Sequence, residues 1–236
     1  MVLTAGLAGL ALSAVGIAHQ LLPRRFTTAQ RRAISAWEME RRWRALPAGT
    51  IFPASVPYQL PANALESTSN LVLDARRLGI SPAARCTSAV SATAIRVLSE
   101  HRCSAAMRAT YADSSGSMVA TVTVAVLPCA SAARAVVAGL PGSGAGRMVS
   151  RTLRITGTPA AGFSDGDRQL SRTAATGSYV ILVTAGFSDG RHHMRLAGDA
   201  YVDAEMVSFV SGLVHAARSA LGGPLPVLSC PGAPGC

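Results

Sequence analysis

The sequence predicts an α+β fold: a two-layer domain with a mostly antiparallel sheet and helices on one face, preceded by an N-terminal membrane helix and a basic amphipathic helix. Three observations lead to this prediction. The chain opens without charged side chains, an arginine-rich stretch follows, and later strands pair as hairpins rather than βαβ units. We expect five parts: a transmembrane anchor or signal segment over 1–22, a juxtamembrane helix over 23–46, a Pro-rich linker over 47–70, the α+β domain over 71–221 and a disordered Pro/Gly tail over 222–236.

The composition excludes a wholly disordered chain. Of the 236 residues 49% are hydrophobic and only 14% are charged, whereas disorder requires low hydrophobicity and high charge. Every basic residue is an arginine, and the net charge is +10. Seven arginines and two glutamates lie between Arg24 and Arg44, so half of the excess charge belongs to one short segment. This concentration favours a membrane surface over nucleic acid as the partner of the basic segment.

The first 22 residues predict insertion into a membrane. Val2 to Ala18 is an apolar run of 17 residues, at the lower limit for crossing a bilayer. The run also suits a secretion signal cleaved near Ala18, although the basic residues that usually begin such a signal are missing. Pro23 and Arg24 end the segment abruptly.

Charge and cysteine content disagree about which side of the membrane the domain faces. Arg24, Arg25, Arg31 and Arg32 follow the apolar run, and the positive-inside rule places such residues in the cytoplasm. Five cysteines without any C-x-x-C spacing indicate disulfides and therefore an oxidising compartment. We expect an extracytoplasmic domain and keep the cytoplasmic orientation as the alternative.

Residues 27–46 predict a helix. Thr27 and Gln30 have capping-box spacing, and small or apolar residues recur at steps of three or four. The pairs Glu38–Arg42 and Glu40–Arg44 have the favourable i,i+4 order. Aromatic rings beside guanidinium groups suit the lipid headgroup layer as well as an ordinary stalk helix. The candidate membrane-interface residues are Arg24, Arg25, Arg31, Arg32, Trp37 and Trp43.

The globular part combines strong and weak elements. The alternating, β-branched runs over 118–127 and 179–187 predict the firmest strands. We also expect a helix between Cys86 and Cys103, a helix over 130–140 and a last helix over 203–221. Further strands are predicted over 104–112, 149–156 and 168–176.

Cys86 and Cys103 are the first choice for a disulfide. A straight helix between them would be roughly 25 Å long, and a disulfide needs Cα atoms within about 7 Å. The pair therefore requires a shorter helix and a flank that folds back. Cys129 is another candidate partner, and Cys230 and Cys236 could pair locally in the tail.

The hexapeptide AGFSDG occurs at 161–166 and again at 185–190. Its Asp-Gly step predicts turns, with type I′ hairpin geometry as the first expectation. Both copies also match G-x-S-x-G, and Asp199 or Asp203 and then His215 follow Ser188. A serine hydrolase would need a strand before and a helix directly after the serine, so we keep this enzyme only as the alternative function.

No metal or cofactor site is predicted. His192 and His193 are adjacent and would face opposite sides of a strand. The glycines at 142, 144 and 146 follow a helix and lack the Lys-Ser/Thr of a phosphate loop. Catalytic residues are likewise not predicted.

Three segments carry a resemblance in the order in which they occur. They are WEMERRWRALPA (37–48), IFPASVPY (51–58) and RATYADSSGSMVATVTVAVLP (108–128). With the apolar start, they resemble uncharacterised actinobacterial proteins with one N-terminal membrane segment and an extracytoplasmic domain. The resemblance covers roughly residues 1–190 and implies topology alone. We therefore expect a membrane-anchored, non-enzymatic domain that binds a protein or a cell-envelope component.

Overall fold

The computed structural model describes residues 27–62, 69–140, 148–191 and 200–223. The chain divides into two units, residues 1–37 and 38–236. Helix α2 (Thr28–Ala45) begins in the first unit and ends in the second. The second unit contains the sheet and the other described helices. The expected membrane segment over 1–22 and nearly all of the expected tail over 222–236 lie outside the described residues.

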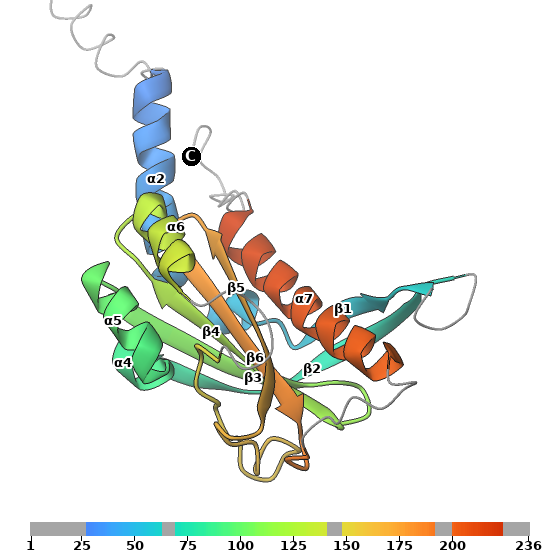
Figure 1. The fold of residues 1–236 in the computed structure, drawn as a ribbon. Helices are drawn as coiled ribbons and strands as arrows, with labels where there is room; N and C mark the ends of the chain where they lie inside the picture. The colour runs from blue at the N-terminus through green and yellow to red at the C-terminus, as the bar shows by residue number, and fades with distance from the viewer. Residues whose placement is uncertain (1–26, 63–68, 141–147, 192–199, 224–236) are drawn as a thin grey trace, which may run out of the picture. The chain divides into compact units, whose positions relative to one another are not determined.

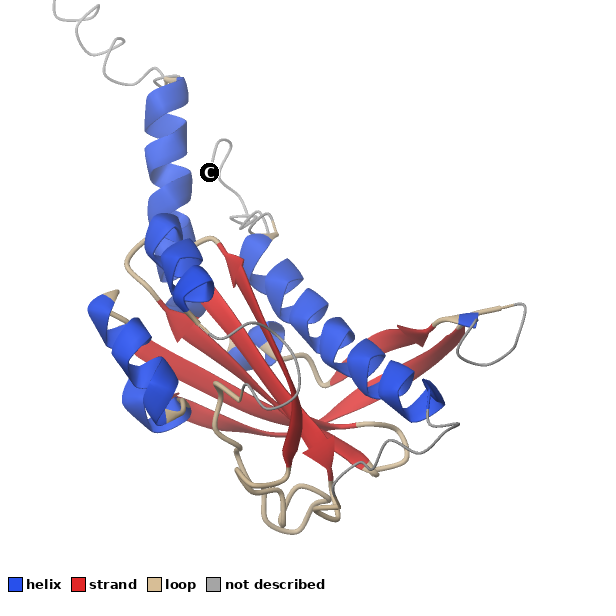
Figure 2. Cartoon of the chain, in the orientation of Figure 1, coloured by secondary structure: helices blue, strands red, loops and turns tan. Residues whose placement is uncertain are grey.

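The second unit is built on one antiparallel sheet of six strands in the order β1-β2-β3-β4-β6-β5 (Figures 1 and 2). The strands are β1 (Ser55–Leu60), β2 (Leu71–Ala84), β3 (Ala105–Ala112), β4 (Met118–Val126), β5 (Arg168–Thr176) and β6 (Tyr179–Phe187). Two hairpins, β3–β4 and β5–β6, pair side by side through β4 and β6. The predicted α+β class and antiparallel sheet are confirmed.

Helices cover both faces of the sheet, and the expectation of helices on one face was wrong. Helix α7 (Ala200–Gly222) packs on one face, in a core with alternate residues of β3, β4 and β6. The opposite face packs against α4 (Cys86–Ala89), α5 (Ala92–Glu100) and α6 (Ala130–Gly139). Every residue of β4 and of β6 is buried. A strand buried on both faces requires a cover on both sides, so the domain has three layers.

Part of the expected linker belongs to the sheet. Residues 47–70 contain the short helix α3 (Ala48–Ile51) and the edge strand β1. Val56, Tyr58 and Leu60 alternate with exposed residues and are buried in the domain. Pro57 is tolerated because β1 pairs on one side only, with β2.

The end of α2 is joined to the end of α7 by a buried arginine. Arg42 is only 4% exposed, and its Nη1 donates hydrogen bonds to the carbonyl oxygens of Leu221 (2.8 Å) and Gly223. The last carbonyls of a helix lack partners within the helix and attract cations. The guanidinium group that was expected to pair with Glu38 therefore bonds to the carbonyl end of α7.

The two AGFSDG copies lie at the same end of the β5–β6 hairpin, one before β5 and one at the end of β6. Equivalent glycines have different surroundings. A Cβ on Gly186 would collide with the carbonyl oxygen of Asp167 and lie 3.1 Å from the ring of Phe163. The nearest atom to a Cβ on Gly162 would be the carbonyl oxygen of Ser188, at 3.8 Å. Only the second copy therefore requires glycine at this position.

Gly186→Ala should lower the free energy of unfolding by about 3 kcal/mol, because the methyl group forces the backbone of Asp167 away from β6. The matched control is Gly162→Ala, which should change stability by less than about 0.5 kcal/mol. Urea unfolding followed by circular dichroism measures both. Equal losses in the two variants would contradict the close approach at Gly186.

Candidate functional site

The predicted disulfide is present between Cys86 and Cys103, whose Cα atoms lie 6.2 Å apart. The helix expected between them is divided into α4 and α5, with a break at Val90 and Ser91. The chain folds back again after α5, where Arg102 has a φ of 57°. These two bends bring the two cysteines within bonding distance, as the sequence analysis required.

The break in the helix also receives a neighbouring segment. Val90 forms an isolated antiparallel bridge with Ser150. The amide of Ser91 donates to the carbonyl oxygen of Val149, and that of Arg151 donates to Ala89, both at 2.9 Å. The break thus satisfies the backbone groups that a continuous helix would have paired internally.

Mass spectrometry under non-reducing conditions, on protein from its native envelope, should find the peptides of Cys86 and Cys103 joined. Replacing both cysteines with serine should lower the free energy of unfolding by about 3 kcal/mol, since the bond closes a loop with a sequence separation of 17. Cys129→Ser is the control and should retain the cystine. Alkylation of Cys86 and Cys103 without prior reduction would contradict the assignment.

Of the four candidate interface arginines, only Arg31 has a described side chain. Arg24 and Arg25 lie outside the described residues, as does the side chain of Arg32, whereas Arg31 is exposed on α2. Thr27 and Gln30 form the predicted capping box, with amide-to-side-chain distances of 2.9 and 3.2 Å.

The two tryptophans of α2 differ in environment. Trp37 is 55% exposed, which suits contact with a surface. Trp43 packs against the main core, and its backbone amide donates to the Tyr179 hydroxyl at 3.2 Å. Packing in the domain therefore accounts for Trp43.

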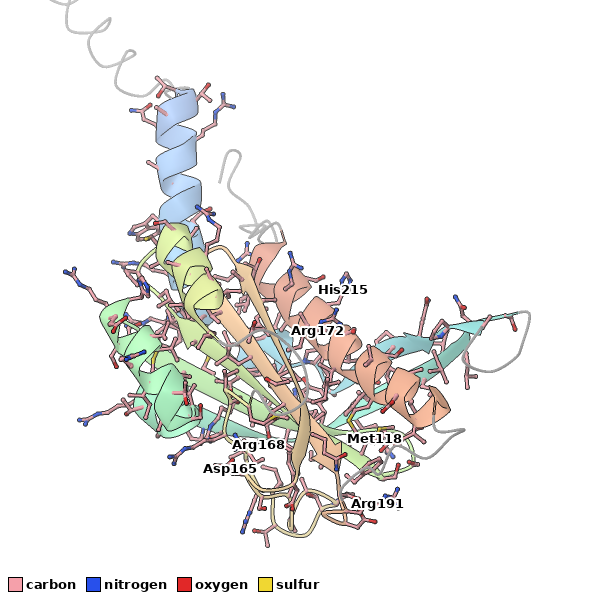
Figure 3. The ribbon with its side chains drawn as sticks, in the orientation of Figure 1. Met118, Asp165, Arg168, Arg172, Arg191 and His215 are labelled. Atoms are coloured by element: carbon pink, nitrogen blue, oxygen red, sulfur yellow. A yellow bond between two sulfur atoms is a disulfide. The ribbon has the colours of Figure 1, made fainter. Side chains whose placement is uncertain are left out.

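Both AGFSDG copies form turns, but neither has type I′ geometry, because neither Asp165 nor Asp189 has a positive φ. A short turn at Gly177 closes the β5–β6 hairpin instead. Ser164 precedes a strand rather than a helix, so it does not form a nucleophile elbow. Figure 3 shows Arg191, directly after the second copy, at the opposite end of α7 from His215. The hydrolase arrangement is therefore not assembled around the second copy.

A strap of residues 148–155 crosses the sheet on the face that carries α4 to α6. The sequence analysis predicted a strand over 149–156, but this segment joins no strand of the sheet. It instead bonds to a hydroxyl belt of fully buried threonines on three strands. The belt consists of Thr110 on β3, Thr121 and Thr123 on β4, and Thr184 on β6.

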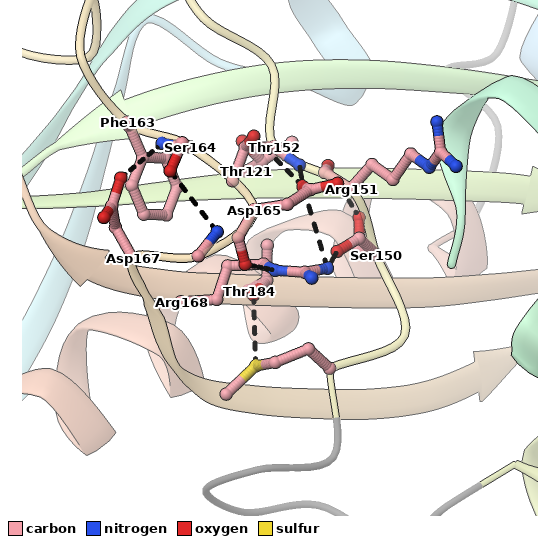
Figure 4. Close-up of polar contacts among 12 residues, drawn as sticks. Thr121, Ser150, Arg151, Thr152, Phe163, Ser164, Asp165, Asp167, Arg168 and Thr184 are labelled. Atoms are coloured by element: carbon pink, nitrogen blue, oxygen red, sulfur yellow. Dashed lines mark hydrogen bonds and ion pairs between the residues drawn. The ribbon is translucent and has the colours of Figure 1, made fainter. Parts of the chain in front are cut away.

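The hydrogen bonds of the strap follow the strands in order across the sheet, and Figure 4 shows the one at Thr184. Thr184 donates to Met148 Sδ at 3.5 Å, and the hydroxyls of Thr123 and Ser150 share a bond of 2.6 Å. Farther along, the Leu153 amide donates to Thr121 Oγ1 at 3.0 Å, and Thr110 Oγ1 donates to the Leu153 carbonyl at 2.6 Å. These bonds satisfy hydroxyls that would be costly to bury alone.

The first hexapeptide holds the strap in place. Asp165 Oδ1 accepts from the amide and hydroxyl of Thr152, at 2.8 and 3.2 Å. Arg168 donates to the carbonyls of Asp165 and Ser150, both at 2.6 Å, and its Nη1 lies 3.7 Å from Asp165 Oδ1. In the second copy, Asp189 contacts only its near neighbour Arg191 among the described residues. Identical sequences therefore have different structural roles.

Asp165→Asn should lower the free energy of unfolding by about 1 kcal/mol, because it removes the charge facing Arg168 and weakens the contacts that hold Thr152. Asp189→Asn, the same change in the other copy, should alter stability by less than about 0.5 kcal/mol. Thermal unfolding and hydrogen exchange of the Thr152 amide provide the measurements. Unchanged exchange in Asp165→Asn would show that the strap does not depend on this carboxylate.

Two arginines on this face, Arg108 and Arg151, act on each other electrostatically. Arg108 lies on β3 directly across from Thr123, and Thr123 bonds to Ser150, the neighbour of Arg151. Burial lowers the pKa of Arg108 below its ordinary value, and Arg151 lowers it further, whereas Asp165 raises it. Arg108 therefore carries its positive charge in a partly desolvated location, and the exposed Arg151 adds to the positive charge around it.

A separate open pocket of about 380 Å³ lies beside the β3–β4 turn, within the size range of small-molecule sites. Its lining includes Arg76, Leu78, Asp113 and Ser115. Asp113 is buried, and its carboxylate accepts from the amides of Met118 (2.8 Å) and Ser115 (3.2 Å). The carboxylate thus holds the turn and is not free to act as a general base.

Two other side chains with a shifted pKa, Tyr111 and Glu205, make contacts that stabilise the fold. Burial raises the pKa of Tyr111, whose hydroxyl donates to the Pro53 carbonyl at 3.0 Å. Burial also raises the pKa of Glu205 on α7, and the hydrogen bond from the Tyr58 hydroxyl, at 3.2 Å, partly offsets this. These contacts tie the segment between α3 and β1 to β3, and α7 to β1.

Metal ligands do not cluster in the part of the chain that the structure describes. His192 and His193 lie outside that part. Among the described helices, none combines the length and apolar character needed to cross a membrane.

Comparisons with known protein families, curated proteins and solved structures find no match. The strap and Arg108 were missed by the sequence analysis. The sequence did contain a signal for the strap, since Thr121 and Thr123 place hydroxyls on alternate positions of an otherwise apolar strand. Such hydroxyls need partners when buried, but the sequence does not identify which segment supplies them.

Proposed function

We propose that this chain is a membrane-anchored, non-enzymatic domain that faces out of the cytoplasm and binds a protein or a cell-envelope component. The cystine between Cys86 and Cys103 is the observation that carries the proposal. Disulfides persist in oxidising compartments and are rare where thiols are kept reduced. The bond also joins the two ends of the α4–α5 pair that receives the strap, so it belongs to the architecture of the domain.

Membrane attachment is supported by the apolar run from Val2 to Ala18 and by the helix that follows it. In α2, Arg31 and Trp37 are exposed on a helix that begins with a capping box. A tryptophan ring and a guanidinium group both suit the headgroup layer of a bilayer. Cleavage near Ala18 would instead release the domain into the medium. Fractionation of the cells separates anchoring from release.

Binding rather than catalysis is supported by how the polar side chains are used. Asp113 holds a turn, and Asp165 holds the strap. Ser164 accepts from the amide of Gly166 at 3.3 Å within its own turn. These groups stabilise loops instead of converging on one point where a reacting atom could lie.

The side of the membrane can be measured with one engineered thiol. The full chain would carry Cys129→Ser, Cys230→Ser, Cys236→Ser and Ser219→Cys. Ser219 is exposed on α7, so a membrane-impermeant maleimide should label it in intact cells. The control is the same chain with Ser219 retained, which should stay unlabelled.

Labelling of Ser219→Cys only after the cells are permeabilised would overturn the extracytoplasmic orientation and support the positive-inside alternative. Fractionation of the same cells tests the anchor. We expect the chain in membranes after alkaline carbonate washing, and its appearance in the medium would replace anchoring with secretion.

A further inference from the structure

The face that carries the strap has an excess of positive charge. Its helices add arginines to those already described, whereas the acidic groups there are few and already engaged in part by Thr152 and Arg168. The arginines placed on this face by their elements are Arg85 and Arg102 beside α4 and α5, Arg134 on α6, Arg108 on β3, and Arg151 and Arg154 on the strap.

Arg108 is a half-buried charge without a matching counter-ion. Within the described residues, no hydrogen bond or ion pair engages its guanidinium group. Asp165 is the acid that acts on it electrostatically, but that carboxylate already accepts two hydrogen bonds from Thr152 and faces Arg168. Charges removed from water are normally paired, so this group has unused capacity for an anion.

Arg151 is held beside Arg108 by the strap. The Arg151 amide donates to Ala89, and the preceding Ser150 bonds to Thr123, the cross-strand partner of Arg108. In Figure 4 the Arg151 side chain extends away from the contact between Asp165 and Arg168. The two like charges repel each other, as the lowering of the Arg108 pKa by Arg151 indicates, and an anion that contacts both would relieve that repulsion.

We propose that the strap face is an oxyanion-binding surface centred on Arg108 and Arg151, and that it takes the phosphate or carboxylate groups of an anionic envelope polymer. The inference rests on the proposed function and specifies its partner. Guanidinium groups bind such oxyanions with charge-assisted, often bidentate hydrogen bonds. The hydroxyl belt holds the strap, and with it the backbone of Arg151, against the sheet.

Binding would be measured on the purified full-length chain in detergent micelles, by calorimetry at about 50 and 200 mM NaCl. Polyphosphate and polyglutamate are the probes, one for each oxyanion chemistry, and inorganic phosphate is the competitor. Binding of either polymer that weakens at the higher salt concentration supports the proposal, and the preferred polymer identifies the chemistry. Failure of both polymers to bind at the lower salt concentration would overturn it.

The variants locate the site. Arg108→Gln and Arg151→Gln should each weaken binding by about 5- to 10-fold. Arg218→Gln is the matched control, because Arg218 is exposed on α7, which packs on the opposite face. Equal weakening in all three variants would indicate nonspecific attraction to a basic protein and would reject the site.

Thermal unfolding separates binding from a structural role. Arg108→Gln removes an uncompensated, half-buried charge and should leave Tm unchanged or raise it. A loss of binding accompanied by a marked fall in Tm would assign Arg108 to the fold instead. Because binding is measured on purified protein, the result is independent of the labelling experiment that tests membrane orientation.

Discussion

The other layers of the domain are arranged around β4 and β6, which are buried on both faces. Neither strand has an exposed residue. One face is covered by α7 and the other by the shorter helices and the strap. Strands of this kind require apolar side chains in both directions. Although only 5% of the residues are aromatic, the core under α7 gathers tyrosines and phenylalanines, whereas the core under α4 to α6 consists mainly of alanine, valine and leucine.

The face covered by α4 to α6 is not uniformly apolar, because buried threonine hydroxyls lie among its apolar side chains. An apolar cluster lies under α4 to α6, and a smaller one contains Val119 and Phe163. The hydroxyl belt lies along the same strands between them, as the alternation of residues on β3 and β4 shows. The strap supplies the belt with partners, and Asp165 and Arg168 secure the strap. Arg108 lies on β3 next to this belt, and among the described residues its guanidinium group has no hydrogen bond or ion pair.

The disulfide and the strap belong to one structural unit. Cys86 and Cys103 join the ends of a helix pair whose break bonds directly to the strap. Reduction would therefore loosen a support of the surface that carries Arg151. This connection links the compartment in which the protein is proposed to work to the stability of its proposed binding surface.

The local elements, and a first choice for one long-range pair, could be predicted from the sequence. The β-branched runs over 118–127 and 179–187 became strands, Thr27 and Gln30 capped α2, and the spacing of Cys86 and Cys103 correctly required a bent helix. These features depend on backbone preferences and short-range geometry, which neighbouring residues encode.

Where each segment lies, and what its side chains contact, could be read only from the packed chain. Residues 149–156 have an extended pattern, but every position beside a central strand was already taken, so the segment crosses the sheet and bonds to threonine hydroxyls. Arg42 bonds to the end of α7 instead of pairing with Glu38 as expected. The two identical hexapeptides make different contacts, Asp165 with Thr152 and Asp189 with Arg191. The physical reason is that burial and hydrogen-bond satisfaction are properties of the whole packed chain.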